Sequence, residues 1–143
     1  MLSQRCRYAL KAMLNLARDT SGNPKQVSAL SAEENIPRKF LEGIMSDMRQ
    51  GGLVDASRGK TGGYRLAKPA ELITFGEVMR RMDGPIALLA CVSQNFYRRC
   101  DDCTDERSCE LRRVMGRVRR EASDILDRTT LADAIAKPVL GDF

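Results

Sequence analysis

Four of the five cysteines lie in one short stretch, where Cys91, Cys100, Cys103 and Cys109 follow the spacing C-x8-C-x2-C-x5-C. Thiolates are the ligands that soft and borderline metals select, so these sulfurs predict a site for an iron-sulfur cluster or a zinc ion. The surrounding residues are acidic and lack regular periodicity, which argues against a set of small buried side chains. Structural zinc sites usually join two close cysteine pairs; only one is present, so a cluster is favoured.

The 143-residue chain contains no histidine and no tryptophan. The absence of histidine removes the commonest general acid/base, the Ser-His and Cys-His nucleophile pairs and every zinc site that uses an imidazole. We therefore expect a protein that is not an enzyme. No apolar run approaches the roughly 18 residues of a membrane span, and no signal-peptide core is visible, so we expect a soluble, cytoplasmic protein.

The net charge of +5 is unevenly distributed along the chain. Residues 1–83 contain 14 lysines and arginines against 9 acidic residues, whereas residues 84–143 contain 10 of each. The basic excess therefore belongs to the first part and suggests a polyanionic partner, although a modest excess of this kind more often serves solubility alone. We expect two parts, a DNA-binding domain over 1–83 and a cysteine loop with dimerisation helices over 84–143.

Apolar periodicity in the first part predicts three helices followed by two short strands. The first helix covers about residues 3–18, the second is short and ends before Pro37, and the third ends at Gly51 and Gly52. Residues 53–57 and 63–67 read as strands joined by a basic turn. This order is that of a winged helix-turn-helix, a mainly α fold with a small β-hairpin wing.

Two further helices are predicted beyond the hairpin, together with a short one at the end. Thr74 and Glu77 form a capping-box signature before the fourth helix, and Thr130 with Asp133 is a weaker signal of the same kind. A long helix over about 110–128 carries an apolar stripe. A core position would explain this stripe, but a dimer contact gains weight because helix-turn-helix proteins commonly read two half-sites. The stripe consists of Leu111, Val114, Met115, Val118, Ala122, Ile125 and Leu126.

Charged side chains at two places predict DNA contacts. Arg38 and Lys39 begin the third helix, where a major-groove reader places its base-contacting residues, and Glu42 could accept from a cytosine amino group. Arg58 and Lys60 lie on the turn between the strands. The alternative is a solvated charged surface, but the ordered combination favours DNA. The fifth cysteine, Cys6, falls on the inward stripe of the first helix, so we expect a buried structural thiol.

Several stretches resemble the bacterial winged-helix regulators that include IscR, NsrR, RirA and CymR, and the resemblance covers nearly the whole chain. It implies that the long helix crosses its partner in a dimer, that a 2Fe-2S or 4Fe-4S cluster in the cysteine loop controls operator binding, and that Tyr8 approaches the DNA. The stretches are Tyr8-Ala9-Leu10, residues 36–42, Gly52-Leu53-Val54 and, most specifically, the Arg-Gly-x-x-Gly-Gly-Tyr wing over residues 58–64.

The chain departs from that family in its cysteines. Cluster-binding members typically have three, with five residues between the last two, so Cys103 and Cys109 match and Cys100 is additional. The ligands are either Cys91, Cys103 and Cys109 with an outside group or all four cysteines. Some relatives supply a histidine, or an acidic residue where Arg7 stands here. Since this chain has neither, the resemblance favours all-cysteine ligation.

These observations predict a homodimeric DNA-binding transcriptional repressor whose cluster senses iron supply, redox state or nitric oxide. Two alternatives stay open. The same regulator could use a thiol/disulfide pair, Cys100 with Cys103, or a structural zinc ion in place of the cluster. The chain could also be an electron-carrying iron-sulfur protein, although electron transfer does not require a wing.

Overall fold

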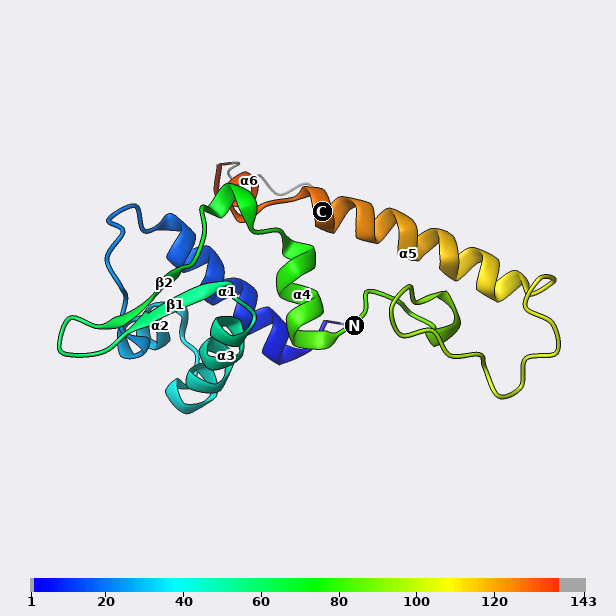
Figure 1. Ribbon diagram of the computed structural model, residues 1–143, viewed down its shortest axis with the longest axis horizontal. Coiled ribbons are helices and arrows are strands. Elements are labelled where there is room, and N and C mark those ends of the chain that lie inside the picture. The colour runs from blue at the N-terminus through cyan, green and yellow to red at the C-terminus, as the bar shows by residue number, and fades with distance from the viewer. Residues whose placement is uncertain (1, 137–143) are drawn as a thin grey trace.

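The structure is a computed structural model that describes residues 2–136. It is mainly helical with one two-stranded antiparallel sheet, as predicted. Figure 1 shows an elongated molecule, with the short helices and the sheet at one end and a long helix leading away from them. The elements in order are α1 (Gln4–Arg18), α2 (Val27–Glu34), α3 (Arg38–Gln50), β1 (Val54–Ser57), β2 (Gly63–Leu66), η1 (Ala70–Leu72), α4 (Phe75–Asp83), η2 (Ala90–Val92), α5 (Glu110–Arg128) and α6 (Leu131–Ala136).

Local signals account for where the helices begin and end. The Ser3 hydroxyl accepts from the Cys6 backbone N–H at 3.0 Å and caps α1. Asn35 ends α2 in the left-handed region, with φ of 52°, and Pro37 precedes α3. The capping box of α4 is present in both directions between Thr74 and Glu77. Because such bonds span three or four residues, the sequence predicts them well.

The hairpin is held by close backbone contacts. Val54 pairs with Leu66 and Ser57 with Gly63, so the turn over residues 58–62 forms the tip of the wing. A Cβ on Gly62 would lie 2.3 Å from the Ser57 carbonyl oxygen, which only glycine avoids. The paired glycines of the wing motif therefore serve backbone packing.

One hydrophobic core joins α1, α2, α3, α4 and α6. Met13, Leu41 and Met48 are fully buried in it, and each such side chain stabilises the fold by about 1.5–3 kcal/mol. Leu131 of α6 is equally buried in this core, although it follows the long helix in sequence. The division at residue 83 stays a prediction, and residues 137–143 of its second part lie outside the described residues.

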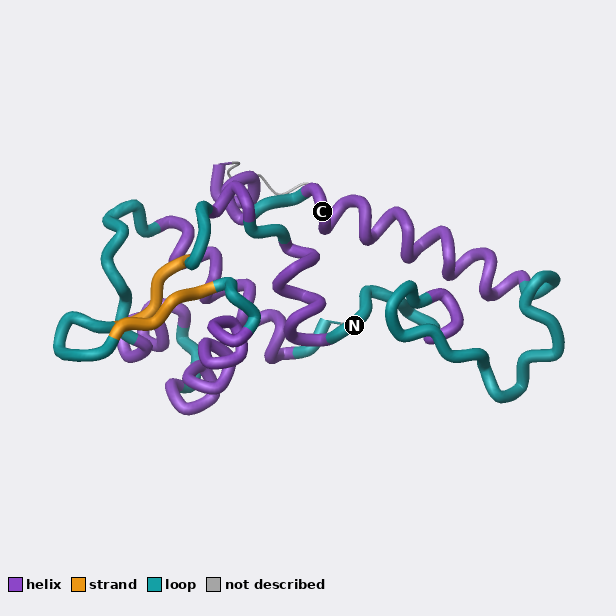
Figure 2. Tube along the Cα trace, viewed as in Figure 1, coloured by secondary structure: helices purple, strands orange, loops and turns teal. Residues whose placement is uncertain are grey.

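The second part is a long arm. Figure 2 shows that the segment between α4 and α5 is loop apart from the single turn of η2, and that α5 runs back from this loop towards the core. None of the helices described within residues 2–136 has the length and apolar composition of a membrane span. The arm thus places the four loop cysteines away from the wing (Figure 1).

Candidate nucleic-acid interface and cysteine loop

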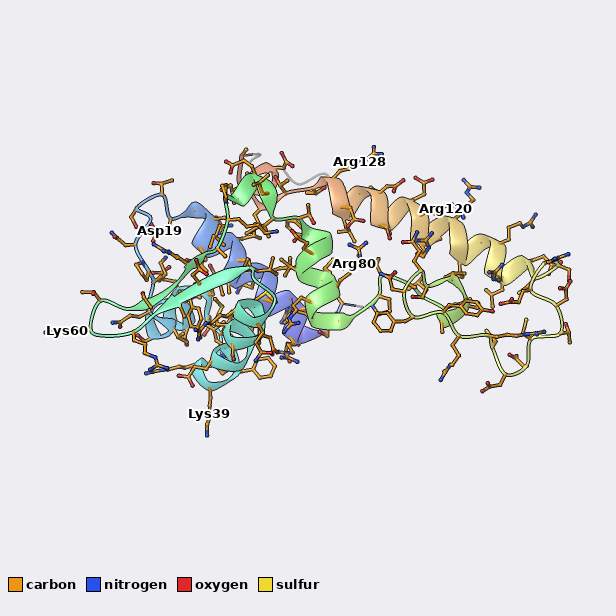
Figure 3. All side chains as sticks on the ribbon, in the orientation of Figure 1. Asp19, Lys39, Lys60, Arg80, Arg120 and Arg128 are labelled. Atoms are coloured by element: carbon orange, nitrogen blue, oxygen red, sulfur yellow. The ribbon has the colours of Figure 1, made fainter. Side chains whose placement is uncertain are left out.

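The N-terminal turns of α3 present the charged residues predicted to read DNA. The side chains of Arg38, Lys39 and Glu42 are all exposed. Arg38 Nε donates to Glu42 Oε1 at 3.1 Å, one helical turn away. Arg38 and Glu42 therefore neutralise each other in this structure, a pairing that was not predicted, and only Lys39 projects freely (Figure 3).

The wing presents a second cationic site. Arg58 and Lys60 are exposed on the turn, and Figure 3 shows Lys60 projecting from its tip. The Gln26 side-chain amide donates to the Lys60 carbonyl oxygen at 3.0 Å, which ties this turn to the start of α2. Gln26 carries no motif that sequence reasoning could have used. The contact fixes the wing against the helix-turn-helix.

Tyr8 is half-buried and braces α3 from α1. Its ring meets Phe40 edge to face, with centroids 5.8 Å apart, and the Arg7 guanidinium lies 5.5 Å from its centroid. Gln4 Nε2 donates to the Tyr8 hydroxyl at 2.8 Å. Contact of Tyr8 with DNA stays a prediction, while its packing role was not foreseen.

A polar network behind α2 was also missed. Asn15, a buried polar residue of α1, donates to Glu33 Oε2 at 2.9 Å and to Glu34 Oε1 at 2.8 Å. Lys25 Nζ donates to Asn15 Oδ1 at 2.7 Å and pairs with Glu33 at 2.8 Å. These bonds lower the pKa of Glu33, chiefly through its bond with Lys25. The network holds α2 against α1.

The four loop cysteines are free thiols at different depths. Cys91 is buried on η2, and Cys109 caps α5, its Sγ accepting from the Arg112 backbone N–H at 3.4 Å. Both line one cleft of about 420 Å³ between the loop and α5. A hydrogen bond with Cys91 is the main reason that the pKa of Cys100 is raised. Cys103 lies in the loop, with its N–H bonded to the Cys100 carbonyl oxygen at 3.2 Å.

The expected convergence of all four sulfurs is not seen in this conformation. Among residues 2–136, no three His, Cys, Asp or Glu side chains lie close enough to hold a metal ion. Cys91 is the common neighbour, since it contacts Cys100 on one side and shares the cleft with Cys109 on the other. The structure therefore brings the ligands together in part, and the ligand set stays a prediction.

Arg112 joins the two ends of the cysteine loop. Its Nε donates to the Cys91 carbonyl oxygen at 3.2 Å and lies 3.8 Å from Glu106 Oε1. The same carboxylate accepts from the Tyr97 hydroxyl at 2.5 Å, which raises the pKa of Tyr97. The cleft is strongly basic, since five arginines line it against the single acid Glu106: Arg107, Arg112, Arg113, Arg119 and Arg120.

Cys6 and the apolar stripe of α5 behave differently from each other. Cys6 is 0% exposed in the core, which confirms the predicted burial, and burial next to Asp83 raises its pKa to about 11. On α5, by contrast, Val118 is 43% exposed and Ile125 64% exposed. Leu111 and Val114 are exposed as well, and Met115, Ala122 and Leu126 are half-buried. The stripe is therefore not one more core face within this chain.

Comparisons with known proteins place this geometry in a family. Residues 2–137 match the family Rrf2, described as an iron-dependent transcriptional regulator. An HTH-type regulator of Rhodobacter capsulatus, named rrf2-like, is 39% identical over 139 residues, which cover 95% of this chain and 93% of that protein.

Solved structures agree. CymR, titled the global cysteine regulator of B. subtilis, superposes with a TM-score of 0.79 at 29% identity, covering 95% of this chain and 96% of its own. IscR of T. potens shares the fold, with a TM-score of 0.74 at 24% identity over 100% of this chain and 93% of its own. The winged helix, the regulator class and the absence of an enzymatic role are thereby confirmed, and the chain belongs to the Rrf2 family of transcriptional regulators.

Proposed function

We propose that this protein is a homodimeric repressor whose affinity for its DNA operator is controlled by an iron-sulfur cluster held in the cysteine loop. The observation that carries the proposal is the basic cleft beside the N-terminus of α5, which Cys91 and Cys109 both line. This cleft adjoins the helix that bears the exposed apolar stripe. A change at the cleft can therefore act on the pairing of two copies.

DNA recognition is supported by cations on two elements. Lys39 and Arg38 at the start of α3 suit the major groove, and Arg58 and Lys60 on the wing suit the minor groove or its phosphates. Glu42 is suited to a cytosine amino group once Arg38 turns to the DNA. Tyr8 lies beside Phe40 at the same helix and is a weaker candidate for the backbone.

A dimer is supported by the exposure of the α5 stripe. Val114, Val118 and Ile125 offer an uncovered apolar face on one helix. A second copy of this helix would bury it, and two-fold symmetry would then set the spacing of the two recognition helices on DNA. The occupant we propose is therefore the same helix of a second chain.

Cluster binding is supported by the chemistry of the cleft. The available donors are thiols, and the surrounding arginines would offset the negative charge of a thiolate-ligated cluster. Cys91, Cys103 and Cys109 would be ligands, with Cys100 as the fourth. Since no three potential ligands lie together among residues 2–136, ligation requires the cysteine loop to rearrange. The bound cluster would act as the sensor, because it would be lost when the iron supply is low and oxidised or degraded when oxidants or nitric oxide are present.

Purification without oxygen tests this function directly. We expect a coloured dimer with iron and sulfide in equal amounts, whose affinity for a duplex selected from random DNA changes when the cluster is removed. Cys100→Ser should reduce cluster content as much as Cys103→Ser if four cysteines bind, and less if an outside group is the fourth ligand. A colourless, iron-free protein with unchanged DNA affinity would refute the cluster. Cys6→Ala is the matched control and should keep full cluster content.

A thiol switch is the second candidate, and one contact favours it. Cys91 interacts with the Cys100 thiol and raises its pKa, so a disulfide between these two thiols is an alternative to one between Cys100 and Cys103. Native mass spectrometry separates the candidates, because a disulfide lowers the mass by two hydrogens whereas a cluster or a zinc ion raises it.

A further inference from the structure

Helix α4 lies between α5 of the arm and α3, the proposed recognition helix. It contacts both helices through two adjacent arginines. Arg80 reaches α5, and Arg81 reaches the C-terminal end of α3. In Figure 3, Arg80 lies on α4 below the end of α5 that carries Arg128. Since neighbouring side chains of a helix point in directions about 100° apart, adjacent residues of α4 can contact two different helices.

The contact of α4 with α5 is a bidentate ion pair. Arg80 Nη1 and Nη2 donate to the two oxygens of Asp127 at 2.5 and 2.8 Å, which lowers the pKa of Asp127. Gly76 makes room for this pair, because a Cβ there would lie 2.0 Å from Asp127 Oδ1 and 2.9 Å from Arg80 Nη1. Parallel N–H···O bonds of this kind fix orientation as well as distance.

Backbone bonds strengthen the same junction. The Phe75 N–H donates to the Thr129 carbonyl oxygen at 3.0 Å, and the Leu131 N–H donates to Ile73 at 2.9 Å. Two backbone bonds therefore attach the segment between α5 and α6 to the start of α4 and the residues before it, and one ion pair joins α5 to α4 itself. A change in the direction of α5 must bend this junction or move α4.

The contact of α4 with α3 lies at the far end of the recognition helix. Arg81 Nε donates to the Asp47 carbonyl oxygen at 2.9 Å, and its stem packs where Gly51 has no side chain. Cations are favoured at the C-terminal carbonyls of a helix. The 13 residues of α3 span about 20 Å. When the helix tilts about its contact at Asp47, Arg38 and Lys39 at its other end are therefore displaced.

We infer that Arg80 and Arg81 are positioning residues through which α4 transmits the state of the cysteine loop to the recognition helix. This inference rests on the proposed function. The loop connects the end of α4 to the start of α5, so a change in its shape alters the angle between these two helices. Because the Arg80–Asp127 pair joins α5 to α4 and the Arg81 contact joins α4 to α3, a change in the angle between α4 and α5 changes the tilt of α3.

The test compares the DNA affinity of cluster-loaded and cluster-free dimers by fluorescence anisotropy, on a duplex selected from random DNA by the wild-type protein. We expect the two wild-type affinities to differ by at least about fivefold. In Asp127→Asn the two affinities should lie within about twofold of each other, with unchanged iron and sulfide content and an unchanged dimer. Asp124→Asn removes the same charge about one turn away, at an exposed position of α5, and should behave as wild type.

Gly76→Ala provides a second route should Asp127→Asn fail to fold. Its methyl group would displace two flexible side-chain ends without removing a charge or a backbone bond, so the protein should fold and lose the affinity difference. Arg81→Gln should have the same effect from the α3 side. A variant with full cluster content and the full wild-type difference would overturn the inference alone, whereas equal wild-type affinities would overturn the proposed function with it.

Discussion

Lys25 and Tyr64 exchange two backbone hydrogen bonds of 2.8 Å each, which join the segment before α2 to the second strand of the wing. The side chain of the same lysine is held by Asn15 and Glu33. The helix-turn-helix and the wing are therefore one rigid unit. Because the two elements proposed to contact DNA are fixed to each other, they need no mutual ordering on binding.

Replacing Gly63 by alanine should break this junction. A Cβ at Gly63 would lie 2.3 Å from the Lys25 carbonyl oxygen, and its φ of +148° is rarely adopted by other residues. We expect the free energy of unfolding, measured in urea, to fall by about 2 kcal/mol or more. Gly59→Ala, at φ of +102° with no atom within 4 Å, is the control and should cost less. Equal losses would contradict the close-approach argument.

Removal of the recognition-helix cations should weaken DNA binding. If Arg38 and Lys39 contact bases, replacing either by alanine should weaken the free energy of DNA binding by about 1–3 kcal/mol. If they contact phosphates, either replacement should reduce the slope of log affinity against log salt concentration by about one. Anisotropy titrations at several salt concentrations measure both. Arg128→Ala removes an exposed arginine that Figure 3 shows pointing away from Lys39 and Lys60, so it should leave binding unchanged.

A charge on the apolar stripe should separate the dimer. In Val118→Glu the carboxylate would be buried against the partner helix, whereas in a single chain this position is 43% exposed and accepts a charge. We expect monomers by analytical ultracentrifugation, with helix content unchanged by circular dichroism. Asp124→Lys alters the charge at an exposed position of α5 outside the stripe and should stay dimeric. A Val118→Glu dimer of wild-type affinity would place the interface elsewhere.

The raised pKa of Cys6 predicts a loss of stability in alkali. Below pH 9 this thiol is protonated in both the folded and unfolded chains, so it adds no pH dependence. Between about 9 and about 11 the unfolded thiol loses its proton while the buried one keeps it, and the free energy of unfolding falls. Urea titrations at pH 8, 9 and 10 should show a smaller decline for Cys6→Ala than for wild type. Identical slopes would mean that Cys6 does not titrate as described.

Much of the fold was predictable because its signals are local. The capping box of Thr74 and Glu77, the stop at Gly51 and the glycine-rich turn each act within a few residues, and the structure confirms all three. The charged candidates for DNA contact lie at exposed positions, whereas Tyr8 is half-buried. The pairing of Arg38 with Glu42 follows the i, i+4 spacing of a helix, so the sequence contained the signal for it.

The element order, the family and the residue types of the site follow from the sequence, since periodicity, caps and the wing motif depend on neighbouring residues. Which helix faces meet follows from the folded chain. The tertiary structure placed Leu131 in the core of the first part, brought Asp127 to Arg80 across 47 positions and set Cys91 beside Cys100. Periodicity identifies a face but not its partner, because the partner depends on the path of the whole chain.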